Sequence, residues 1–111
     1  MQNNFKNIEF LKKITTHDYQ GFLKLPPMMP FSSEITDYLN ALSKEINKDP
    51  RIQEFPDVRT FSFFCRKANL LLLKKKHNDS GELKLGRGLV FHVAPSNIPV
   101  NFAFSLMIGL L

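Results

Sequence analysis

The feature that most constrains this chain is its carboxyl-terminal quarter, residues 86–111, in which Arg87 is the last charged residue. Residues 89–94 form a short apolar run rich in β-forming residues, with glycine before it and proline after it. That pattern is typical of a strand buried on both faces of a parallel sheet. From Pro99 onward the residues suit a helix, since proline is tolerated in a first helical turn. The stretch therefore predicts a strand, a polar loop and a buried helix, and open α/β sheets bind ligands at such loops.

The same stretch resembles a known family. The pattern Val90-x-x-Val93-x-Pro95-x-Asn97-x-Pro99 is similar to the strand-to-helix motif of the aldehyde dehydrogenase superfamily. With Ser96 where most aldehyde dehydrogenases have tryptophan, residues 86–111 resemble the acyl-CoA reductase branch of LuxC type. A looser similarity extends over residues 31–77. The resemblance implies an α/β fold, present as an incomplete aldehyde-dehydrogenase-like fragment.

The expected fragment has amino-terminal helices, then a β-hairpin-like pair, then the first strand and helix of a parallel nucleotide-binding sheet. Residues 1–30 are expected to be an amino-terminal arm. Residues 31–111 are expected to begin the catalytic and nucleotide-binding domain, truncated at its carboxyl-terminal end. Because the predicted strand lacks neighbours on either side, we expect the chain alone to be poorly soluble or partly ordered.

The resemblance also implies a function, the NADP(H)-dependent reduction of a fatty acyl-CoA or other acyl thioester to an aldehyde. It assigns oxyanion stabilisation to Asn97 and places Pro95 and Ser96 against the cofactor. It further implies a homo-oligomer or an acyl-transfer partner for the full-length enzyme. Without the resemblance, an asparagine between two prolines indicates only a turn residue. The family's nucleophilic cysteine lies downstream of residue 111, so the chain alone is expected to be inactive.

Other chemistry has little support from the residues. Cys65 is the only thiol and falls on the apolar stripe of a predicted helix, which favours an inert core residue. His92 lies within the apolar run and is expected to pack there. Metal-ligand spacing and a glycine-rich phosphate loop are absent, since Gly86-x-Gly88 precedes the predicted strand rather than following it.

Two helices precede this quarter. The first is expected to begin at Ser32 or Ser33 and to end near Pro50, with an apolar face at helical spacing. Its expected face comprises Ile35, Tyr38, Leu39, Leu42 and Ile46. The second is expected from Asp57, as N-cap, to Lys76. Its last three lysines are expected to face solvent and offset the helix dipole, in preference to forming an anion site.

Composition and charge limit the partners and the location that can be expected for this chain. The net charge of +5 is concentrated in the second predicted helix, which is a weak case for nucleic-acid binding, so no nucleic acid is expected as a partner. A single cysteine and a polar amino terminus favour a cytoplasmic protein. The clean apolar run, residues 102–111, is about half of the roughly 20 residues that a membrane span needs, so no span is expected. The alternative function is a small basic interaction protein whose apolar tail meets an acidic partner or a membrane surface.

Overall fold

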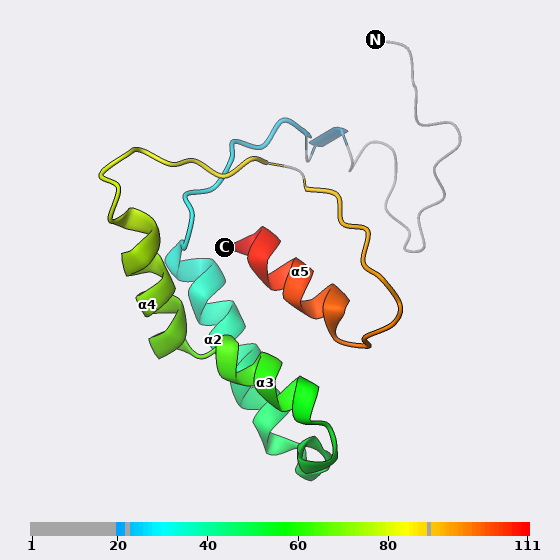
Figure 1. The fold of residues 1–111 in the computed structure, drawn as a ribbon. Helices are drawn as coiled ribbons and strands as arrows, with labels where there is room; N and C mark the ends of the chain where they lie inside the picture. Colours follow the sequence, from blue (N-terminus) through cyan, green and yellow to red (C-terminus); the bar gives the residue numbers. More distant parts are fainter. Residues whose placement is uncertain (1–19, 22, 89) are drawn as a thin grey trace.

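The computed structural model describes residues 20–21, 23–88 and 90–111, and the elements that it defines are helical (Figure 1). They are α2 (Ser33–Lys48), the 3₁₀ helix η1 (Pro50–Glu54), α3 (Pro56–Phe64), α4 (Lys67–Asn78) and α5 (Asn101–Leu110). Residues 79–88 and 90–100 belong to a long irregular connection that passes around the helices from α4 to α5.

The predicted α/β fold is wrong, because the described residues contain no strand. Both the expected hairpin-like pair before residue 88 and the expected sheet strand at residues 90–94 are irregular. A strand is stabilised by ladders of backbone hydrogen bonds to a neighbour. Among the described residues, one such bond, from the Gly86 N–H to the Met28 carbonyl (2.9 Å), joins residues 82–97 to another segment.

Helix α2 forms as its sequence predicts. Ser32 caps it, with its Oγ accepting from the Ile35 N–H at 3.4 Å, and Glu34 and Lys48 suit the dipole at the two ends. Most of the predicted apolar face packs inward, with Leu39 only 1% exposed. Tyr38 is the exception on that face, since it is 55% exposed.

The second predicted helix is instead two helices. α3 ends at Phe64, Cys65 is its C-cap, and Arg66 adopts an extended conformation (φ −65°, ψ 140°) before α4 begins. The start also differs, because Phe55 is the N-cap and Asp57 lies in the first turn. The break lets α3 and α4 both pack along α2, which a straight helix of that length would not do.

Two serines hold α2 against α3. The Ser43 hydroxyl donates to the Ser62 carbonyl (2.7 Å), and the Ser62 hydroxyl donates to the Ser43 carbonyl (3.1 Å). Asn47 adds an Nδ2 donor to the Ser62 Oγ at 2.8 Å. Both serines are buried, so the small side chains allow close approach while the hydroxyls satisfy each other's polar groups.

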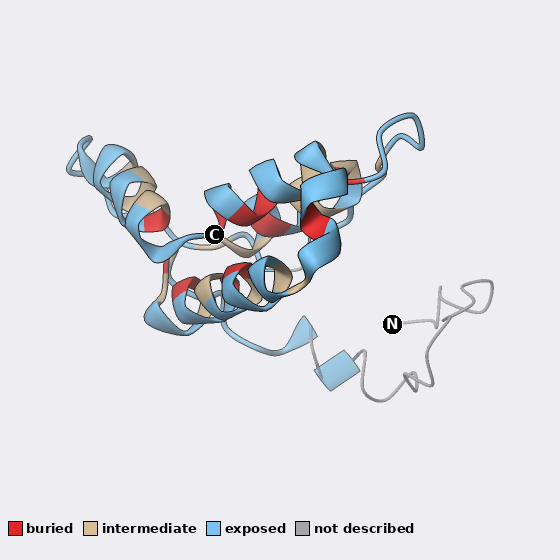
Figure 2. Ribbon diagram, turned by 90° about the horizontal axis from the view of Figure 1, so that it is seen from below, coloured by how far each residue is buried: buried red, intermediate tan, exposed pale blue. Residues whose placement is uncertain are grey.

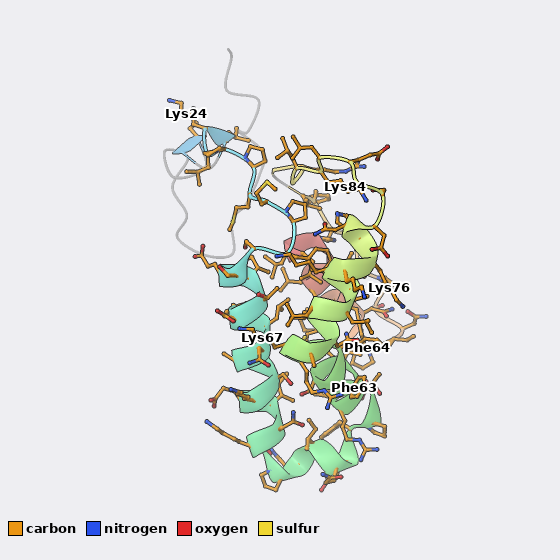
Figure 3. The ribbon with its side chains drawn as sticks, turned by 90° about the vertical axis from the view of Figure 1, so that its left-hand side faces the viewer. Lys24, Phe63, Phe64, Lys67, Lys76 and Lys84 are labelled. Atoms are coloured by element: carbon orange, nitrogen blue, oxygen red, sulfur yellow. The ribbon has the colours of Figure 1, made fainter. Side chains whose placement is uncertain are left out.

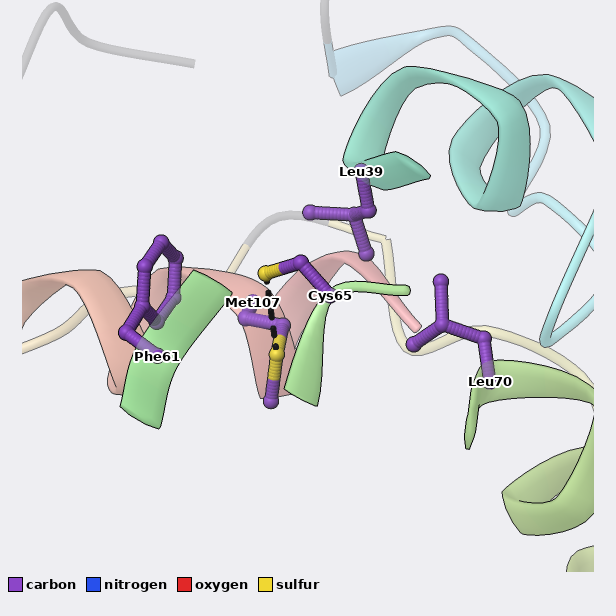
Figure 4. Close-up of a cluster of buried hydrophobic side chains, with 5 residues drawn as sticks. All are labelled: Leu39, Phe61, Cys65, Leu70 and Met107. Atoms are coloured by element: carbon purple, nitrogen blue, oxygen red, sulfur yellow. Dashed lines mark hydrogen bonds between the residues drawn. The ribbon is translucent and has the colours of Figure 1, made fainter. Parts of the chain in front are cut away.

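The core lies where α2, α3, α4 and α5 meet. Figure 2 shows buried residues on the inward faces of the helices, and Figure 4 shows the central cluster. This cluster comprises Leu39, Phe61, Cys65, Leu70 and Met107. α5 joins it through Met107 and Phe104, whose ring packs edge-on against Phe61 at a centroid distance of 5.3 Å. The helix predicted after Pro99 is therefore confirmed, but its predicted burial is wrong, because Met107 is the one buried residue within α5.

Phe31 connects three parts of the fold. Its N–H donates to the Leu111 carbonyl (2.8 Å), its carbonyl accepts from the Lys74 Nζ (3.3 Å), and its ring lies 5.3 Å from the His77 ring. Its φ of 54° is in the left-handed region, which is unfavourable for a residue with a large side chain. These contacts hold the start of α2 beside the last turns of α4 and α5 despite that cost.

Candidate functional site

The predicted site residues lie in the loop that enters α5. Residues 96–100 form bends and a turn, and the Asn101 N–H donates to the Ile98 carbonyl (3.1 Å) as the helix starts. Pro95, Ser96 and Asn97 are all exposed. The structure thus confirms a loop ahead of a helix, but the loop follows an irregular segment rather than the carboxyl end of a sheet strand.

The Asn97 carboxamide has no hydrogen-bond partner among the described residues. Its N–H groups are therefore available to an external acceptor. In other respects the surroundings are sparse, since neither Pro95 nor Ser96 lines a described hollow. The two hollows described below therefore offer no binding surface for a nicotinamide ring beside these residues.

An apolar hollow of about 640 Å³ lies elsewhere, between the proline-rich residues 25–30, residues 86–88 and the last turn of α5. Leu25, Met29 and Leu110 are among its apolar lining residues, and Arg87 is the charged residue at it. None of the three predicted site residues lines this hollow. It is therefore a separate feature from the Asn97 loop.

Cys65 is a core residue, as its position on the apolar stripe predicts. It is 0% exposed, its Sγ lies 3.6 Å from the Met107 Sδ, and burial raises the pKa of its thiol to about 11 (Figure 4). A nucleophilic cysteine needs the opposite, an accessible thiol with a lowered pKa. Cys65 is consequently not a catalytic nucleophile in this fold.

His92 differs from its predicted role as a buried packing residue, because it is exposed. Its ring lies across Gly109 of α5, where a Cβ atom would come within 2.5 Å of the His92 Nε2. The expected burial required a sheet on both sides of residue 92. Without that sheet, the ring lies beside Gly109 of α5 and the residue remains open to solvent.

A basic groove of about 440 Å³ lies between α2 and the start of α4, and sequence reasoning missed it. Asn40, Lys44 and Lys48 line it from α2, and Arg66 and Lys67 line it from the other side. The spacing of the α2 residues, every fourth position, indicates a polar stripe on that helix. The groove also depends on the break before α4, which the sequence pattern did not reveal.

The described residues also bear on metal binding and on membrane crossing. In residues 20–21, 23–88 and 90–111, no group of three or more histidine, cysteine or acidic side chains is placed to hold a metal ion. No helix within those ranges combines the length and the hydropathy needed to cross a membrane. Comparison with protein-family models, curated proteins and solved structures finds no match for this chain.

Proposed function

We propose that this chain belongs to an acyl-CoA reductase and contributes the oxyanion donor Asn97 to it. The resemblance of residues 86–111 to the LuxC-type branch motivates the proposal. The observation that carries it is the state of Asn97, an exposed carboxamide between two prolines with no partner among the described residues. Such an amide can donate to an external oxygen without first breaking a hydrogen bond to the described part of the chain.

The chemistry requires that donor. When a cysteine thiolate attacks an acyl thioester, the carbonyl oxygen becomes negatively charged in the tetrahedral intermediate, and the CoA thiolate then leaves. An amide N–H aimed at that oxygen stabilises the charge as it develops. By resemblance, NADP(H) would supply the hydride for the later reduction, in which the cysteine thiolate would leave the acyl carbon as the aldehyde forms. The proline on each side of Asn97 restricts the loop backbone and so limits the positions of the amide.

The nucleophile in this proposal comes from outside these 111 residues. Cys65 is the only cysteine in the chain, and it is fully buried with a raised pKa. We therefore expect the purified chain to release no aldehyde from an acyl-CoA and NADPH. Turnover by the chain alone would overturn the division of roles between Asn97 and an external cysteine.

A loop graft tests the role of Asn97 directly. Residues 95–111 replace the matching segment of a working LuxC-type reductase, and aldehyde release is measured. Because removing one oxyanion donor costs about 10²- to 10³-fold in kcat, the Asn97→Ala graft should lose that much relative to the unmodified graft. Asn101→Ala is the matched control, because it removes the same side chain from the first residue of α5 within the grafted segment, and it should leave kcat within about 3-fold. Equal kcat for the unmodified and Asn97→Ala grafts would refute the proposal.

The second candidate is a small basic interaction protein, and the exposed apolar side chains of α5 favour it. Phe102, Leu106 and Ile108 are 65%, 50% and 68% exposed on that helix. Exposed apolar side chains on one helix of a basic protein suit an interfacial contact with an acidic partner or membrane. Cosedimentation with anionic vesicles that high salt abolishes would support this candidate. Absence of cosedimentation at low salt would exclude the membrane form of it.

A further inference from the structure

The basic groove between α2 and α4 presents hydrogen-bond donors that lack acceptors. Lys44 is exposed, and its ammonium group has no acceptor among the described residues. The Asn40 Oδ1 accepts from the Lys67 N–H at 2.9 Å. Since a backbone N–H can only donate, this bond fixes the orientation of the carboxamide and leaves its NH₂ group free to donate.

Arg66 adds further donors in a fixed position. Its guanidinium lies 3.8 Å from the centroid of the Phe63 ring, and its Nε–H donates to the Phe63 carbonyl at 3.4 Å. Stacking on an aromatic ring holds a guanidinium without using its terminal amino groups. Within the described chain those two groups have no acceptor, so they remain available at the rim of the groove.

The charge of the groove is only partly offset. Lys67 pairs with Asp37 (Nζ to Oδ1, 2.6 Å), and Lys48 pairs with Glu45 (Nζ to Oε1, 2.6 Å). All four of these side chains are at least half exposed, so the pairs are weak and can yield to a stronger anion. Neither acid lines the groove itself, whereas both lysines do (Figure 3 labels Lys67, beside α2).

We propose that this groove binds the phosphate groups of a small phosphorylated ligand. Its free groups are cations and amide donors, and a planar guanidinium beside an ammonium matches phosphate oxygens well. A volume of about 440 Å³ exceeds a single phosphate and falls within the usual range of small-molecule sites. We therefore assign the site to a diphosphate-bearing ligand, with inorganic diphosphate as its simplest probe.

In the first test, the isotope-labelled chain is titrated with sodium diphosphate at low salt, and binding is measured from the chemical shifts of its amide NMR signals. The signals of Asn40 and Lys67 should move with a saturable dependence, and Lys44→Gln should weaken binding about 3- to 10-fold. Lys75→Gln is the matched control, because it removes the same charge from an exposed lysine at the opposite end of α4. It should leave the affinity within about 2-fold.

A second variant should strengthen binding, which general damage to the fold would not do. Asp37→Asn releases Lys67 from its ion pair, so the affinity for diphosphate should rise about 2- to 5-fold. Glu82→Gln removes an equal charge from an exposed residue outside the groove and is its control.

Three results would overturn the proposal: unmoved groove signals, equal affinities for Asp37→Asn and Glu82→Gln, or equal binding of sulfate and diphosphate. ADP identifies the source of the phosphates. Binding of ADP as tight as that of diphosphate, or tighter, supports a nucleotide ligand, and weaker binding supports a free inorganic anion. The readout involves no aldehyde formation, so its outcome is independent of the proposed reductase function.

Discussion

The burial of Cys65 predicts that its thiol reacts far more slowly in the folded chain than in the unfolded chain. Burial raises its pKa from 9.0 to about 11. At about pH 8 this shift alone lowers the thiolate fraction about 100-fold, since each pKa unit is a factor of ten. The raised pKa and the 0% exposed side chain are two results of the same burial, and reaction through local opening should be slowed by at least about 100-fold.

The assay is the reaction of the chain with a chromogenic aromatic disulfide, at about pH 8, with and without about 6 M guanidinium chloride. Cys65 is the only cysteine, so the released chromophore reports on it alone. Met107→Ala is an informative variant, because it removes the sulfur that lies 3.6 Å from the Cys65 Sγ. It should speed the folded-state reaction by opening the core beside the thiol.

A folded-state rate within about tenfold of the unfolded rate would refute the reasoning, provided that circular dichroism shows the helices intact. Such a result would mean that Cys65 is accessible, and it would return that thiol to consideration as a nucleophile. It would also mean that the four-helix core is not closed around Leu39 and Phe61. The same measurement therefore tests the core and the exclusion of Cys65 from catalysis.

Three further predictions follow from particular contacts. Ser62→Ala removes the hydroxyl that bridges α2 and α3, so the free energy of unfolding should fall by about 1–3 kcal/mol, and an unchanged urea midpoint would contradict this. Gly86→Ala places a Cβ 2.6 Å from the Met28 carbonyl oxygen, so the amide of residue 86 should exchange with solvent faster, whereas retained protection would count against the contact. Hydrogen bonds and charge from Arg51 lower the pKa of Asp49 from 3.8 to about 2. The stabilising contribution of the Asp49 carboxylate is therefore present above about pH 4 and is lost as the pH falls toward about 2. Carboxyl NMR should show the low titration midpoint, and a midpoint near about 4 would disprove the pairing.

Local sequence patterns predicted a helix correctly where neighbouring residues supply its cap and its apolar spacing. For α2, the Ser32 cap and the apolar spacing of Ile35, Leu39 and Leu42 are properties of neighbouring residues, and they formed as expected. The helix after Pro99 also formed, although no side chain caps its start. The assignment of Cys65 to the core also followed from its place among apolar residues at helical spacing.

The strand at residues 89–94 could not be decided in the same way. An apolar β-forming run becomes a strand only when another segment pairs with its backbone, and that partner is not encoded in the run itself. In the described residues 90–94 that pairing is absent, and the fold is helical instead. The exposed position of His92 and the open surroundings of Asn97 follow from the same missing partner.

What the sequence by itself determined is the position of the Asn97 loop, the two best-signalled helices and the inert character of Cys65, because each depends on residues close together in the chain. Only the tertiary structure decided that the chain breaks at Arg66, and this break sets Arg66 and Lys67 beside Asn40 and Lys44. The physical reason is that α3 and α4 both gain packing against α2 by separating. The basic groove, and the phosphate site proposed in it, exist because of that long-range packing.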